Sequence, residues 1–81
     1  MNMAIWYENF IVVKNERRKV IRFEAKPGAN VSDVINDVVK YLKFHDLDKE
    51  YLLILDETEI QINQNSTKID IVKNYTDNIN L

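Results

Sequence analysis

The ionisable side chains best suited to chemistry fall into three short groups. One is a histidine with two aspartates, one is an acidic run and one is a basic run: His45-Asp46-Leu47-Asp48, Asp56-Glu57-Thr58-Glu59 and Arg17-Arg18-Lys19-Val20-Ile21-Arg22. Imidazole with carboxylate groups can bind a metal ion, clustered carboxylates can bind cations, and clustered guanidinium and ammonium groups can bind an anionic partner.

The histidine and acidic groups lack the residue spacing that such chemistry requires. His45 is the only histidine and there is no cysteine, so it is expected to be a solvated loop residue, and the acidic run is expected to be a solvated turn. The sequence also has no Ser/His/Asp set and no glycine-rich phosphate loop. We therefore expect neither enzyme activity nor a metal ion nor a cofactor.

The basic group stands out because the whole chain has a net charge of −2. Residues 14–26 carry mostly cations, whereas acidic residues are in excess elsewhere; the cations are Lys14, Arg17, Arg18, Lys19, Arg22 and Lys26. Nucleic-acid-binding proteins usually have a net positive charge because phosphate contacts dominate their affinity. The expected partner is therefore a protein with an acidic surface and not a nucleic acid.

Length and composition indicate one small domain spanning residues 1–81, with 46% apolar residues for its core. The chain has no cysteine, its apolar runs are too short to span a membrane, and residues 1–10 do not resemble a signal peptide. These features predict a cytoplasmic protein without a membrane span. They do not indicate an oligomeric state.

The clearest expected element is a helix over residues 31–42. Its apolar side chains recur at the helical period and form one stripe: Val31, Val34, Ile35, Val38, Val39 and Leu42. Asn30 or Ser32 can cap its first turn, and Pro27-Gly28 upstream is a turn signal.

Strands are expected on both sides of this helix. Residues 4–14 and 19–25 are rich in β-branched and aromatic residues, with a hairpin turn at 15–18; residues 51–55 and 60–62 follow the helix. A short helical turn at 69–73 and a last strand starting at 79–81 complete the order. The predicted fold class is α+β, with a mixed sheet of four to five strands and one helix packed across it.

The expected first strand contains more aromatic residues than one face can bury. Trp6, Tyr7 and Phe10 cannot all point inward, because successive side chains of a strand point to opposite faces. One or two of them can therefore form an exposed binding patch, although the simpler interpretation is that they cover the outer face of the sheet.

The whole chain resembles the ubiquitin-like β-grasp superfamily. The resemblance is carried by the hairpin over residues 5–25, the helix VSDVINDVVKYL, the strand YLLIL and the closing pattern KIDIVKNYTDNINL. It implies that Tyr75 packs under a loop and that the last strand occupies the centre of the sheet. The chain lacks the Gly-Gly end of ubiquitin-type modifiers, so conjugation in that manner is not expected.

Within that superfamily, the basic strand, NVSDVI and YLLILDE look most similar to Ras-association and Ras-binding domains. Such domains dock their second strand edge-to-edge on a small GTPase, and the residues matched by position are Arg18, Lys19, Arg22 and Lys40. The same charges on a sheet edge could instead only prevent unwanted pairing with other chains.

Two other functions remain open. The chain is also similar in length to the ubiquitin-like accessory proteins of bacterial type VII secretion, and it resembles the small β-grasp subunits of multicomponent monooxygenases, which contribute no chemistry themselves. All of these readings describe a non-catalytic protein–protein interaction module.

Overall fold

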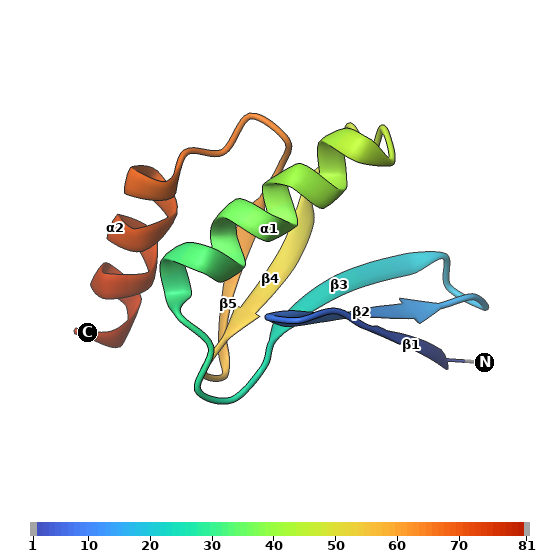
Figure 1. Ribbon diagram of the computed structural model, residues 1–81, viewed down its shortest axis with the longest axis horizontal. Coiled ribbons are helices and arrows are strands. Elements are labelled where there is room, and N and C mark those ends of the chain that lie inside the picture. Colours follow the sequence, from blue (N-terminus) through green and yellow to red (C-terminus); the bar gives the residue numbers. More distant parts are fainter. Residues whose placement is uncertain (1, 81) are drawn as a thin grey trace.

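The structure is a computed structural model that describes residues 2–80. These residues form five strands and two helices, in the order β1 (Asn2–Trp6), β2 (Phe10–Asn15), β3 (Val20–Ala25), α1 (Val31–Phe44), β4 (Tyr51–Leu55), β5 (Thr58–Ile62) and α2 (Lys68–Ile79). The predicted α+β class with a mixed five-stranded sheet is confirmed (Figure 1).

The strands lie in the sheet in the same order as in the chain, β1-β2-β3-β4-β5. Neighbouring strands are antiparallel except β3 and β4, which are parallel and connected through α1. A parallel pair needs a crossover connection of this kind, whereas the antiparallel pairs are joined by short turns. β3 is therefore the central strand, and no C-terminal strand occupies the centre of the sheet within the described residues.

Helix α1 forms where its apolar periodicity predicts it. Asn30 caps it, because its side-chain oxygen accepts a hydrogen bond of 3.2 Å from the backbone N–H of Asp33. The helix ends at His45, whose backbone N–H donates to the carbonyl oxygen of Tyr41. The buried side chains of its stripe are Val34, Ile35, Val38 and Leu42.

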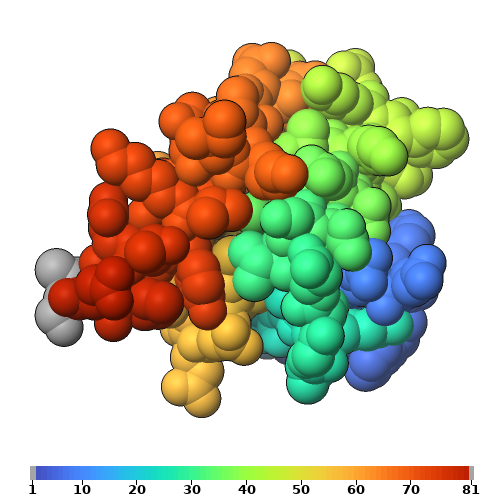
Figure 2. Space-filling model, turned by 60° about the vertical axis from the view of Figure 1, so that its left-hand side comes forward, coloured from blue at the N-terminus to red at the C-terminus, as the bar shows by residue number. Residues whose placement is uncertain are grey.

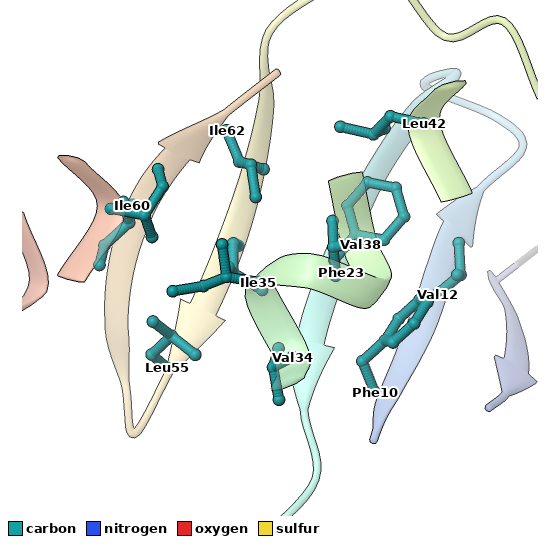
Figure 3. Packing of buried hydrophobic residues seen from close by; sticks show 12 residues of the cluster. Phe10, Val12, Phe23, Val34, Ile35, Val38, Leu42, Leu55, Ile60 and Ile62 are labelled. Carbon is teal, nitrogen blue, oxygen red and sulfur yellow. The ribbon is translucent and has the colours of Figure 1, made fainter. Parts of the chain in front are cut away.

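The core lies between α1, α2 and one face of the sheet. In Figure 3, Val34, Ile35 and Val38 of α1 lie between two groups of strand residues. One group consists of Phe10, Val12 and Phe23 and the other of Leu55, Ile60 and Ile62, and all nine side chains are buried. Burial of a large apolar side chain stabilises the fold by about 1.5–3 kcal/mol, so this cluster holds the helices on the sheet.

The prediction of one continuous strand over residues 4–14 is wrong. A turn at residues 7–9 separates β1 from β2, and the backbone N–H of Tyr7 donates to the carbonyl oxygen of Phe10. Asn9 also donates a 2.7 Å side-chain hydrogen bond to Asp37 of α1. The polar pair Glu8-Asn9 thus turns the chain and ties the β1–β2 hairpin to the helix.

The predicted helical turn at residues 69–73 belongs to a longer helix, whereas the predicted last strand and the count of one helix are wrong. Residues 68–79 form the single helix α2, capped by the Thr67 hydroxyl, which accepts from the backbone N–H of Asp70. Its Ile71 is buried in the core, and Figure 2 shows α2 against α1. Ile79 is the last residue of α2, and Leu81 lies outside the described residues.

We predict that Ile71→Ala lowers the free energy of unfolding by about 2–4 kcal/mol, because it leaves a cavity beneath α2. Ile69→Ala is the matched control on the same helix, since the Ile69 side chain is 77% exposed, and it should change stability by less than about 0.5 kcal/mol. Urea denaturation followed by circular dichroism measures both values. Equal losses in the two variants would contradict this packing of α2.

Candidate functional site

The predicted binding residues Arg18 and Lys19 lie in the turn between β2 and β3. The backbone N–H of Arg18 donates to the side-chain oxygen of Asn15, at 3.1 Å, and Lys19 has a positive φ of 55°. Both side chains are exposed at this tip of the sheet. The hairpin turn predicted for residues 15–18 is confirmed, with β3 beginning at Val20.

Arg22 lies in the middle of β3, and its position corrects the predicted docking mode. β3 pairs with β2 along its length and with β4 at Arg22, Phe23 and Glu24. The prediction that the basic strand is a sheet edge is therefore wrong, because β4, reached through α1, takes the side that would have been free. From Arg22 to Glu24 the backbone is paired on both sides, so this part of β3 offers no free edge for edge-to-edge docking.

Lys40 is separated from the other three predicted residues. It lies on α1, on the helix side of the sheet, and it lines a groove with the rings of Tyr7, Tyr41, Phe44 and His45. Arg22 points to the opposite side of the sheet, because Phe23 beside it is buried under α1. The structure therefore brings Arg18, Lys19 and Arg22 onto one hairpin but does not bring Lys40 to them.

The most unusual surface is the side of the sheet that faces away from the helices, here called the open face. Its members alternate along the strands with the buried residues; they are Asn2, Ala4, Trp6, Ile11, Val13, Asn15, Val20, Arg22, Glu24, Leu52, Ile54, Glu59 and Gln61. Trp6 is 68% exposed, Val20 51% and Leu52 36%. Outward faces of antiparallel sheets are usually polar, whereas most of these side chains are apolar.

Strand register arranges the open face in rows that run across the sheet, of which two span all five strands and a shorter third consists of Asn2, Asn15 and Val20. One of the two long rows reads Trp6, Ile11, Glu24, Ile54, Glu59 from β1 to β5, and the other reads Ala4, Val13, Arg22, Leu52, Gln61. Both rows place an ionic side chain on the central strand with apolar side chains on its two neighbours.

The ionic side chains of the two rows pair with each other. Arg22 Nε lies 2.6 Å from Glu24 Oε2, in an exposed position. Such an exposed ion pair adds little stability, on the order of 0–1 kcal/mol, so both groups keep most of their capacity to interact with another molecule. Lys26 Nζ lies 5.4 Å from the centre of the Trp6 ring and covers part of one ring face.

The prediction that Trp6, Tyr7 and Phe10 do not all point inward is confirmed, but the turn at residues 7–9, and not the alternation of one strand, separates them. Phe10 is buried, Trp6 points outward on the open face, and Tyr7 lies in the turn with its ring stacked on Phe10 at a centroid distance of 5.0 Å. Sequence reasoning missed most of the other open-face residues. A signal for them was present in YLLIL and FIVVK, which carry apolar residues on both faces of their strands. The predicted helix can cover only one of these faces.

The groove beside Lys40 has a volume of about 550 Å³ and lies between the β1–β2 turn and the last turns of α1. Partial burial raises the pKa of Tyr41 above its usual value of 10.0, and the nearby phenol of Tyr7 raises it further. The His45 ring lies 4.2 Å from the Tyr41 ring, centre to centre. These contacts give His45 a packing role at the end of the helix.

We predict that Tyr7→Phe lowers the pKa of Tyr41 but leaves it above 10.0, because burial, the larger cause, remains. The folded-state pKa exceeds the unfolded one, so Tyr41 stabilises the fold below about pH 10, and this contribution disappears as pH rises through the folded value. An NMR titration of the tyrosine ring carbons measures the shift. A Tyr41 that titrates at 10.0 or below in the wild type would contradict this account.

Comparisons with known proteins assign no function to these surfaces. No family model, no curated protein and no solved structure matches the chain. Within residues 2–80, no group of three or more His, Cys, Asp or Glu side chains is placed to hold a metal ion. Neither helix in that range has the length and apolar character needed to cross a membrane.

Proposed function

We propose that the chain is a non-catalytic protein–protein interaction module that binds its partner through the open face of its sheet. The observation that carries this proposal is the exposure of Trp6, Val20 and Leu52 on a contiguous, mostly apolar sheet surface. Exposed apolar patches of this kind mark interaction sites, and tryptophan is among the residues that contribute most to binding energy.

The basic hairpin gives this surface a preferred partner chemistry. Arg18 and Lys19 lie beyond one end of the open face, and Arg22 lies at its centre. Apolar contact supplies affinity, whereas charges orient the encounter and accelerate it. The partner should therefore present an apolar patch next to carboxylate groups. A location in the reducing cytoplasm is part of the proposal, because the chain has no cysteine.

A small GTPase remains one proposed partner, on the strength of the sequence resemblance. In this proposal docking uses the open face, which carries Arg22, because β3 pairs on both sides and offers no free edge there. The ubiquitin-like relationship itself stays a prediction, since two helices and a sequential strand order differ from the expected arrangement. An accessory protein of a secretion system, or a non-catalytic subunit of an enzyme complex, would use the same face.

Affinity capture from a lysate of the source organism tests the contact surface. We predict that Leu52→Glu abolishes capture of the specific partner, since a buried carboxylate at the centre of an apolar contact costs on the order of tenfold or more in affinity. Ile69→Glu is the matched control, because Ile69 is exposed on α2, away from the open face. If all three chains capture the same proteins, the open face is not the contact.

Titration with a small GTPase loaded with a GTP analogue tests that partner directly. We expect Arg22→Glu to weaken binding on the order of tenfold at low salt and less at high salt, because added ions screen the exposed charges. Isothermal titration calorimetry at two salt concentrations measures this. Binding that is unaffected by Arg22→Glu and Leu52→Glu would exclude the open face as the GTPase site.

A further inference from the structure

We infer that the open face binds a second copy of this chain, forming a symmetric face-to-face dimer. This inference rests on the proposed function, because it names the partner of the same surface. It goes further by deriving that partner from the order of side chains in the two rows of the open face.

The two rows are complementary to each other. A two-fold axis that runs across the strands, midway between the rows, places one row of a copy on the other row of its partner. Trp6 then faces Ala4 of the second copy, Ile11 faces Val13, and Leu52 faces Ile54, according to the strand register. The largest exposed side chain thus meets the smallest, and every other apolar residue of the rows meets an apolar residue.

The same operation brings opposite charges together on the central strand. Arg22 of each copy faces Glu24 of the other, so the two ion pairs combine into one network at the centre of the interface. A two-fold axis parallel to the strands would instead place Arg22 on Arg22. Because like charges at an interface are strongly unfavourable, the charge pattern selects the first arrangement.

The twist of the sheets affects this pairing least at its centre. Face-to-face sheets pack with their strands about 30° apart, which displaces the outer strands more than the central one. Arg22 and Glu24 are on β3, the central strand, so their alignment survives this rotation. The remaining pair, Glu59 opposite Gln61, lies at the edge of the interface. Glutamine is neutral, so this pair brings no like charges together.

The size of the open face sets the expected affinity. Five strands spaced about 4.8 Å apart and about five residues long give a face of about 24 by 17 Å. Two such faces together amount to about 800 Å², which is below the roughly 1,200–2,000 Å² of stable specific interfaces and in the range of weak, transient ones. We therefore expect a dissociation constant on the order of 10 µM, with dimers forming at higher protein concentrations.

Sedimentation velocity over a wide concentration range, from about 1 to 500 µM, tests for the dimer. Trp6 provides a second readout, because it is the only tryptophan and lies on the open face. Its emission should shift to shorter wavelength as the dimer forms. A single species of monomer mass over the whole range, with an unchanged Trp6 emission, would overturn the inference.

A charge exchange between chains tests the two-fold arrangement itself. Arg22→Glu alone and Glu24→Arg alone should each lose self-association at least tenfold, because each leaves only like charges at the centre. An equimolar mixture of the two variants should recover it, since the carboxylates of one chain then face the cations of the other. The double variant Arg22→Glu/Glu24→Arg should also dimerise.

These variants separate the dimer from the general function. Circular dichroism confirms folding, and both side chains are exposed, so the variants should fold as the wild type does. Failure of the mixture to recover association overturns the dimer. If the mixture does not associate but Leu52→Glu abolishes capture of another protein from the lysate, the open face binds that protein, and only the dimer is excluded. If Leu52→Glu changes neither measurement, both proposals fail.

Discussion

Strand β3 makes backbone hydrogen bonds with a neighbour on either side, and the two surfaces of the molecule depend on this position. Phe23 points from β3 toward α1 and is buried, whereas Arg22 and Glu24 point the opposite way and stay exposed. A strand with period-two alternation that is covered on one side must present its other residues on the far side. One strand therefore anchors the core and carries the central charges of the open face.

Cover for the sheet is supplied on one side only. Helix α1 brings its apolar stripe to that side, and α2 adds Ile71 and packs against α1 and β5 (Figure 1). With both helices used there, the second apolar set of β2 and β4 meets no element of residues 2–80. Burial of these side chains by a partner would lower the free energy by roughly 25 cal/mol for every Å² of apolar surface removed from water. The open face is thus the part of this fold with most to gain from binding.

In the proposed binding mode, the charges of this molecule direct binding more than they stabilise the fold. The Arg22–Glu24 pair is exposed, and the cations Arg18 and Lys19 lie at a turn, where their effect on stability is small. Their arrangement around an apolar surface nevertheless discriminates between partners, because a wrong alignment brings like charges together. We therefore propose that the basic run conspicuous in the sequence acts through Arg22 on the open face and through Arg18 and Lys19 beside it.

Elements whose signals are local could be predicted from the residues of their own segments. The period and cap of α1, the turn at residues 15–18 and the strand at residues 51–55 could be read directly, because each depends on residues close together in the chain. The strands that pair with β3 could not be predicted in this way, because strand pairing joins segments far apart in the chain. Alternation of apolar and polar residues is compatible with both an edge strand and a central strand. Likewise, the apolar periodicity of α2 is weak. The helix is held by contacts that exist only in the folded chain: the Tyr75 hydroxyl donates to Asp56, and Ile71 packs in the core. Which apolar set is covered, and hence which surface stays exposed, therefore depends on contacts between segments far apart in the chain.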